Sequence, residues 1–183
     1  MFNLGKLLVR NNIPHGLLTQ ANSSLITHGR SKCANFFINN TDHEYLFFLD
    51  SDIGFDPEDV LKLLSHNEPI VSGTYPMKTI PIRYCVDVLE PEERRGDLLK
   101  VGGNGMGFVM IHRSVFTDIA QKFPYLKYVP STKDSNYPPT EAEMNNSYHF
   151  FMEEKIDDSF ASEDKSFFSV SYTHLTLPTI RLV

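Results

Sequence analysis

The stretch Tyr45–Asp56, which reads Tyr-Leu-Phe-Phe-Leu-Asp-Ser-Asp-Ile-Gly-Phe-Asp, decides the fold predicted for this chain. Its first five residues form an apolar run without polar alternation, which is typical of a strand buried on both faces of a parallel sheet. Asp50 and Asp52 follow at the strand end, where open α/β folds bind their ligands. We therefore predict an α/β fold with a candidate active site at this edge of the sheet.

The two carboxylates Asp50 and Asp52 favour a site for a divalent cation. Acids this close repel each other unless a positive charge lies between them, and a divalent cation with oxygen ligands commonly carries a phosphate as well. The alternative is that the two acids only end a strand, because Asp-x-Asp often occurs by chance. Asp56 has its own explanation, since it precedes Pro57 and is predicted to cap a helix.

Composition limits the possible classes of protein. A chain of 183 residues with 41% hydrophobic residues has the length and the core of one globular domain. The net charge of −6, without a basic stripe, argues against a nucleic-acid-binding protein. Two cysteines fit a reducing compartment, and no apolar stretch reaches membrane-spanning length. We therefore expect a soluble, cytoplasmic protein.

Hydrophobic periodicity and capping residues place further elements around the central strand. Helices are predicted over Phe2–Asn12, over Leu25–Asn39, after Asp56 and from a Ser114 cap to Phe123. Strands are predicted at Gly16–Thr19, Ile70–Thr74, Ile82–Val88, Leu98–Val101 and Phe108–Ile111. The proline-containing stretch Lys127–Asn146 is expected to be a long irregular loop, a type of segment that often binds substrate.

Several polar or glycine-rich positions are candidate site residues outside the central stretch. Tyr75 and Lys78 follow the second predicted strand and should lie on the same edge as Asp50, where Lys78 could meet a phosphate. Arg30 lies on a predicted helix and is either a surface charge or a phosphate or ribose contact. Gly102–Phe108 precedes a strand, so it is not a dinucleotide fingerprint; its glycines let backbone approach a ligand or bend a strand.

A last candidate is Ser162-Glu163-Asp164, which has the pattern of a helix start with acids in its first turn. On composition alone this structural explanation is sufficient. A carboxylate that faces the Asp50 edge would also suit a general base that deprotonates an attacking hydroxyl.

Taken in order, these motifs resemble inverting glycosyltransferases of the GT-A fold, similar to glycosyltransferase family 2 and closest to its small bacterial and phage type. The resemblance rests on Asp50-Ser51-Asp52, Gly107-Phe108 and Ser162-Glu163-Asp164. Two further matches are Leu-Ile-x-x-x-Arg, ending at Arg30, and Asp-Pro-Glu-Asp at Asp56–Asp59. It implies a Rossmann-like, mostly parallel sheet flanked by helices.

The resemblance also implies roles for these residues. Asp50 and Asp52 would bind Mn²⁺ or Mg²⁺, and with Ser51, Arg30 and Lys78 they would hold a UDP- or GDP-sugar. Glu163 or, preferably, Asp164 would take the proton from the hydroxyl of a glycan, lipid or protein acceptor. The acceptor and sugar pocket would be lined by Gly103, Gly105, Gly107, Phe108 and Tyr75.

Both ends of the chain depart from the family pattern. The usual first strand and the part beyond Glu163-Asp164 are absent, so the chain is expected to be incomplete, a truncation that can abolish activity. Val170–Thr179 resembles one reading frame of a sequencing-library adaptor. We therefore predict a partial domain over 1–169 and a non-native tail over 170–183. The alternative for that tail is a genuine edge strand.

Two other functional classes fit the sequence less well than sugar transfer does. An aspartate-dependent phosphohydrolase also begins with an apolar strand and Asp-x-Asp, but it needs Thr or Val where Gly54 stands. A calcium loop needs glycine where Phe55 stands and glutamate where Leu61 stands. A non-catalytic fragment that binds a sugar nucleotide remains the main alternative.

Overall fold

The structure, a computed structural model, describes residues 2–20, 23, 25–132, 138–156, 159–175 and 179–181. The elements follow one another as α1 (Phe2–Arg10), α2 (Ile26–Asn40), β1 (Tyr45–Leu49), α3 (Pro57–Ser65), β2 (Ile70–Ser72), β3 (Val86–Val88), β4 (Arg94–Arg95), β5 (Leu98–Asn104), β6 (Phe108–His112), α4 (Arg113–Lys122), a 3₁₀ turn η1 (Pro124–Leu126), β7 (Lys127–Tyr128), α5 (Glu141–Asn145), β8 (Ser147–Tyr148), β9 (Glu154–Ile156), β10 (Ser159–Ala161), α6 (Glu163–Leu175) and β11 (Thr179–Arg181).

The central sheet has three strands in the order β1-β6-β2, and both pairings are antiparallel. Tyr45 pairs with His112 and Leu49 with Phe108, while Ile70 of β2 pairs with Ile111. Every strand pairing among the described residues is antiparallel, in this sheet and in the three other sheets. The predicted α/β, GT-A-type fold with a mostly parallel sheet is therefore wrong, and the chain has an α+β arrangement.

The error has a physical cause in the position of β6. Strands β1 and β2 do run in the same direction, because each is antiparallel to β6. However, β6 comes from a segment well beyond both in the chain and inserts between them. This insertion also leaves β1 at the edge of the sheet, where its five residues are half-buried instead of fully buried. An apolar run reveals burial in a sheet, but not the direction of the neighbouring strand.

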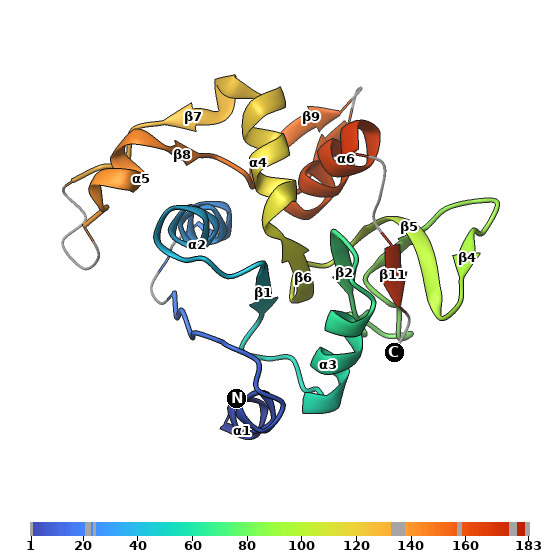
Figure 1. Cartoon of the computed structure of the whole chain (residues 1–183). Coiled ribbons are helices and arrows are strands. Elements are labelled where there is room, and N and C mark those ends of the chain that lie inside the picture. The colour runs from blue at the N-terminus through green and yellow to red at the C-terminus, as the bar shows by residue number, and fades with distance from the viewer. Residues whose placement is uncertain are drawn as a thin grey trace.

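Helices cover both faces of the central sheet (Figure 1). Along β6 the side chains alternate between the faces, as a strand requires. Phe108 and Met110 pack on one side with residues of α1 and α3. Val109 and Ile111 pack on the other side with residues of α2, α4 and α6. The apolar runs in the strands therefore reflect two cores, one on each face.

The predicted helices are confirmed as α1, α2, α3 and α4, with small shifts at their ends. Asp56 caps α3 as expected, because its side chain accepts a hydrogen bond from the amide of Glu58 at 3.0 Å. At α4 the cap is His112, whose ring accepts from the amide of Ser114, so the predicted Ser114 cap is wrong.

Two predictions for connecting segments are wrong. Gly16–Thr19, predicted as a strand, forms no strand and is exposed. The segment Lys127–Asn146, predicted as a loop, contains the short strand β7 and the helix α5 in its described part. A capping box of Thr140 and Glu143 starts α5, and this signal is present in the sequence. Residues 133–137 of this segment lie outside the described residues.

The second sheet is centred on β5, which pairs with β3, β4 and β11. The predicted hairpin of two strands corresponds to β3 and β5. Helix α6 runs from Glu163 to Leu175, so the predicted domain boundary at Ser169 falls inside this helix. In Figure 1, β11 lies beside β5. No helix in the described part of the chain is long and apolar enough to cross a bilayer.

Candidate functional site

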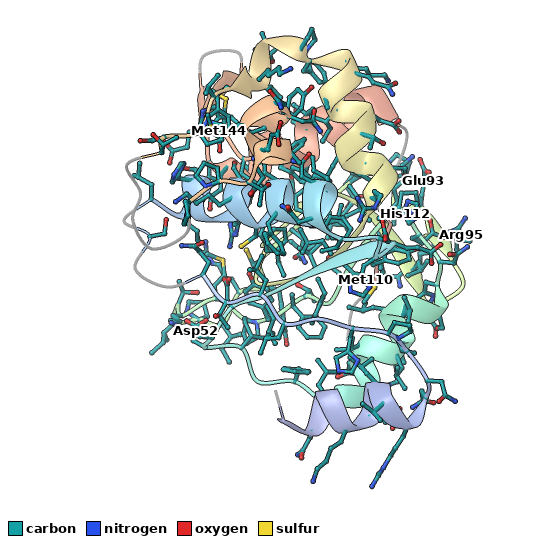
Figure 2. All side chains as sticks on the ribbon, turned by 60° about the vertical axis from the view of Figure 1, so that its left-hand side comes forward. Asp52, Glu93, Arg95, Met110, His112 and Met144 are labelled. Carbon is teal, nitrogen blue, oxygen red and sulfur yellow. The ribbon has the colours of Figure 1, made fainter. Side chains whose placement is uncertain are left out.

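The candidate site lies at the edge of the central sheet where β1 and β2 end. In Figure 2, Asp52 lies at one end of the molecule, while His112, at the far end of the same sheet, lies at the other. Because β1 and β2 point the same way, the segments that follow them meet at this edge. Lys78 donates a hydrogen bond to the Asp52 carboxylate at 2.6 Å. The structure thus brings Lys78 to the Asp50–Asp52 turn.

Arg30 is the centre of the site and joins three segments that are far apart in the sequence. Its Nη1 donates to Glu163 Oε1 at 2.9 Å and to Asp164 Oδ1 at 2.8 Å. Its Nη2 lies 3.5 Å from Asp50 Oδ2. The Arg30 side chain is only 8% exposed, so it is not a surface charge. One guanidinium therefore faces three carboxylates in a partly dry environment, where charge interactions are strong.

Local structure explains why these groups converge. Arg30 lies on the buried side of α2 together with Ala34 and Phe37, which pack in the core. Glu163 and Asp164 are the first residues of α6, where acids interact favourably with the helix dipole. Phe167 and Phe168 on the next turn are fully buried and fix the start of α6 against the core.

Asp164 has the properties of a proton acceptor. Burial, together with the neighbouring Glu163 carboxylate, raises its pKa to about 6, although Arg30 and a hydrogen bond from the Met106 backbone act in the opposite direction. Asp164 is also the more accessible of the two acids, with 27% of its side chain exposed against 13% for Glu163. A carboxylate with a pKa near neutral pH is suited to general base catalysis.

Tyr75 closes the site beside the glycine-rich segment. Its hydroxyl oxygen accepts a hydrogen bond from the amide of Gly107 at 2.9 Å. Burial and the nearby carboxylates of Asp164 and Asp50 raise the Tyr75 pKa to about 12, so this hydroxyl stays protonated and can donate. The amide of Asp50 in turn donates to the Gly107 carbonyl at 2.9 Å. Gly107 therefore ties the Tyr75 segment to the Asp50 turn.

Gly105 and Gly107 are needed because the backbone approaches these side chains closely. A Cβ at Gly107 would lie 2.7 Å from the Tyr75 hydroxyl and 2.9 Å from Asp50 Oδ2. A Cβ at Gly105 would overlap the Tyr75 hydroxyl and lie 2.7 Å from Cys85 Sγ. Gly103 is different, since its Cβ would make only ordinary contacts with Phe168.

A Gly105→Ala variant is expected to be destabilised by about 1–3 kcal/mol, because the methyl group overpacks the space beside Tyr75. Gly103→Ala is the matched control and is expected to be neutral or slightly stabilising, since the methyl group fits and the unfolded chain loses freedom. Urea unfolding of both variants measures the difference. Equal stability of the two would contradict the close approach at Gly105.

The remaining predicted residues have more peripheral positions. Ser51 lies in the exposed turn between the two aspartates. Asp52 and Lys78 form an exposed pair, with 85% of the Lys78 side chain accessible. Gly103 is in β5, against α6, and Phe108 packs in the core against Phe47 and Phe55. The structure thus does not bring Gly103 and Phe108 to the carboxylates.

Sequence reasoning missed two groups at the site. The Met106 backbone forms a hydrogen bond with Asp164, and the predicted approach of the glycine-rich segment to a ligand was the signal for it. The Cys85 thiol lies beside Gly105, and burial followed by the nearby Asp164 charge raises its pKa. Nothing in the spacing of Cys85 indicates this position, which results from pairing of its amide with the Tyr75 carbonyl.

The donor chemistry of the site fits a divalent cation that shares its ligands with a phosphate. Four carboxylates (Asp50, Asp52, Glu163 and Asp164) face two basic side chains (Arg30 and Lys78), so negative charge is in excess. Within the described residues, no three His, Cys, Asp or Glu side chains form a metal-binding group. Mg²⁺ usually takes one or two carboxylates and completes its shell with water and substrate phosphates. Asp50 and Asp52 could supply that number.

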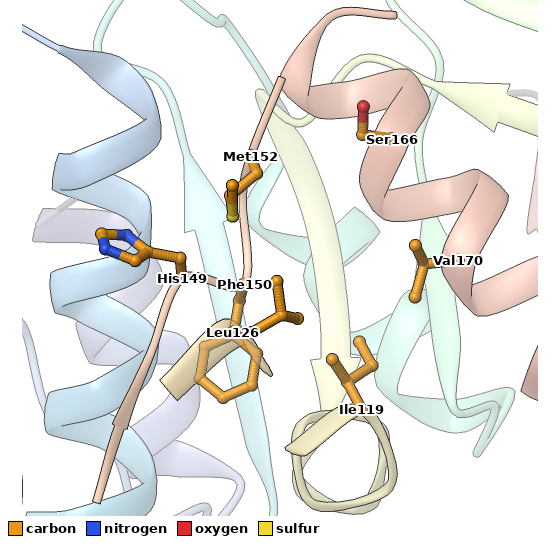
Figure 3. Close-up of a pocket in the computed structure, with 7 residues that line it drawn as sticks. All are labelled: Ile119, Leu126, His149, Phe150, Met152, Ser166 and Val170. Carbon is orange, nitrogen blue, oxygen red and sulfur yellow. The ribbon is translucent and has the colours of Figure 1, made fainter. Parts of the chain in front are cut away.

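A separate hollow lies between α4, α6 and the segment around Phe150 (Figure 3). Its lining is mainly apolar, and none of the candidate site residues contributes to it. The residues that line it are Ile119, Leu126, His149, Phe150, Met152, Ser166 and Val170. Since it continues the core formed by Phe150 and Ile119, we regard it as a packing feature.

Comparisons with known proteins bear on the fold alone. No protein-family profile and no curated protein matches the chain. The crystal structure of A197 from STIV is similar, with a TM-score of 0.52 and 23% sequence identity. The similarity covers 98% of this chain and 74% of that one. Identity at this level indicates a shared arrangement of elements and carries no functional assignment.

Proposed function

We propose that this chain transfers a sugar from a nucleotide-diphosphate sugar to an acceptor hydroxyl, with inversion at the anomeric carbon. The donor is a UDP- or GDP-sugar, the acceptor is a glycan, lipid or protein hydroxyl, and Mn²⁺ or Mg²⁺ is the cofactor. The proposed location is the cytoplasm, for which the free thiols of Cys33 and Cys85 are the supporting observation.

The observation that carries this proposal is the meeting of Asp50 with Glu163 and Asp164 around one buried arginine. The first group was predicted to bind the donor and the second to supply the base. They lie more than a hundred residues apart in the sequence, yet one guanidinium contacts both. A reaction that joins a donor to an acceptor needs this proximity of donor-binding and proton-accepting groups.

In the proposed reaction, Asp164 takes the proton of the acceptor hydroxyl. The acceptor oxygen forms a bond to the anomeric carbon, and the bond from that carbon to the diphosphate oxygen breaks with its electron pair going to the diphosphate. Arg30 holds Glu163 and Asp164 in position, and the Met106 amide orients Asp164 further. The exposed Lys78 is free to turn toward a phosphate when Asp52 is engaged elsewhere.

Asp50 and Asp52 are the residues that would hold the cation. When bound, the cation supplies positive charge to the departing diphosphate. Asp50 reaches this position from the end of β1, and Asp52 from the turn after it.

Donor binding is expected to depend on the metal and on Asp52. Calorimetric titration of the chain with UDP- and GDP-sugars should show heat of binding with Mn²⁺ and a loss of about tenfold or more in affinity without it. Asp52→Ala should abolish the metal-dependent part. Asp42→Ala, a change at an exposed aspartate outside the site, is the matched control and should bind normally. If neither the wild type nor Asp42→Ala binds a donor, although both are folded, the proposal is refuted.

A folded chain that binds donor but transfers no sugar to any acceptor hydroxyl would instead favour the non-catalytic binding protein. Product detection by mass spectrometry, with a mixed panel of glycan, lipid and peptide acceptors, separates these two outcomes. The binding experiment alone cannot separate the enzyme from the non-catalytic binding protein, because both functions use Asp50 and Asp52.

The rate of transfer is expected to fall as the pH drops through about 6. The pKa of Asp164 is raised to about 6, and a protonated carboxyl cannot accept the acceptor proton. At lower pH, kcat/KM should therefore fall about tenfold per pH unit. A pH–rate profile measures this decrease of kcat/KM at low pH. A profile that stays flat from about pH 5 to about pH 7 would contradict the role of Asp164 as base.

A further inference from the structure

The segment from Pro76 to Tyr84 (the tip loop) is an exposed apolar protrusion. All nine of its residues are exposed. They include four large apolar or aromatic side chains, of which Ile80 is fully exposed and Ile82 is 70% exposed; the other two are Met77 and Tyr84. Solvated loops normally have polar tips, so apolar residues concentrated at a tip indicate a binding surface.

The tip loop is anchored at the rim of the candidate site. At its base, the Cys85 amide donates to the Tyr75 carbonyl at 3.2 Å. One step further out, the Met77 amide donates to the Arg83 carbonyl at 2.7 Å. Backbone pairing therefore presents the tip on a short two-stranded stem. The hydrogen bond from Lys78 to Asp52 shows that the stem lies beside the site.

The charges of the tip loop differ from those of the rest of the chain. It contains Lys78 and Arg83 and no acidic residue, although the whole chain has a net charge of −6. Basic side chains, a tyrosine and an apolar tip are the combination found where proteins meet lipid headgroups. The apolar tip enters the acyl boundary, the aromatic ring lies at headgroup level, and the cations meet the phosphates.

We propose that the tip loop docks this protein onto the surface of a phospholipid membrane, with Ile80 and Ile82 inserted between the headgroups. The small size of the tip loop favours a bilayer over a protein partner, because a stable protein interface needs about 20–30 residues a side and the tip loop offers nine exposed residues. The docking is peripheral, consistent with the finding that no described helix is long and apolar enough to span a bilayer. This inference does not depend on the reaction carried out at the site.

The test uses the full chain and vesicles of phosphatidylcholine, alone or mixed with phosphatidylserine. In flotation assays the wild type is expected to float with the vesicles, and more of it with the anionic ones. An Ile80→Ser and Ile82→Ser double variant should bind at least about tenfold more weakly. Val129→Ser, at an equally exposed apolar position, is the matched control and should bind as the wild type does.

A spectroscopic reporter tests insertion directly. The chain contains no tryptophan, so Ile82→Trp introduces a single tryptophan, which can be excited selectively over the tyrosines. Its fluorescence should shift to the blue when vesicles are added, and brominated lipid should quench it. Val129→Trp should show neither effect. Near-ultraviolet circular dichroism and thermal unfolding establish that each variant is folded.

Three outcomes would overturn the proposal. The first is a folded wild type that floats with neither vesicle. The second is a double variant that floats as well as the wild type. The third is self-association of the wild type that the double variant abolishes, without vesicle binding, which would make the tip loop an interface between protein chains.

Discussion

Replacing Asp164 by asparagine is expected to lower the rate of sugar transfer about a thousandfold while donor affinity stays within about threefold, since a positioned base contributes 10²–10⁴ to the rate. The amide has nearly the same shape as the carboxyl group and can keep a contact with Arg30, but it cannot take up a proton. The loss should therefore appear in kcat, and steady-state kinetics together with calorimetric donor binding separates it from a loss of folding.

Two variants serve as controls for Asp164→Asn. Asp42→Asn removes an exposed carboxylate outside the site and should leave kcat unchanged. Glu163→Gln removes the less accessible acid beside Asp164, and its effect on kcat should be clearly smaller. A larger effect of Glu163→Gln would transfer the role of base to Glu163. Equal activity of Asp164→Asn and wild type would mean that the catalytic base does not lie in α6.

Replacing Arg30 by methionine is expected to destabilise the protein by about 3–5 kcal/mol, the range observed when one partner of a buried ion pair is removed. Glu163 and Asp164 would then remain largely buried beside each other without a compensating charge. Methionine keeps most of the side-chain volume, so the effect measures charge and not a cavity. Urea unfolding monitored by circular dichroism measures the change in the free energy of unfolding.

A triple variant tests the explanation. Adding Glu163→Gln and Asp164→Asn to Arg30→Met removes the uncompensated charges and should restore much of the lost stability. Lys78→Met is the exposed counterpart, because Lys78 also pairs with an aspartate of the site but lies in solvent. It should change stability little. A destabilisation by Lys78→Met as large as that by Arg30→Met would mean that burial is not the cause.

The sequence predicted the local elements that carry the candidate site residues. Asp50 and Asp52 follow an apolar run, and Glu163 and Asp164 begin a helix; both patterns lie within a few residues and do not depend on distant partners. Gly105 and Gly107 likewise stand out in sequence, because glycine permits close approach of the backbone. The contact that makes these groups one site, through Arg30, spans more than a hundred residues and leaves no pattern in the sequence.

The direction of the strands also depends on contacts between distant segments, which leave no local pattern in the sequence. The strand positions 45–49, 70–72 and 108–112 agree closely with those predicted, since apolar runs mark buried strands. The antiparallel direction of β6 depends on which segment fills the space between β1 and β2. Helices on both faces make these strands continuously apolar, so the sequence resembles that of a parallel sheet.

The sequence by itself thus determined helices α1 to α4, the positions of β1, β2 and β6, the cap at Asp56 and the two acidic motifs, because each follows from contacts within a few residues. Only the tertiary structure decided the antiparallel order β1-β6-β2, the burial of Arg30 among three carboxylates and the projection of the tip loop beside them. These features depend on contacts between residues far apart in the chain, and such contacts are selected by packing of the whole core and not by local preference.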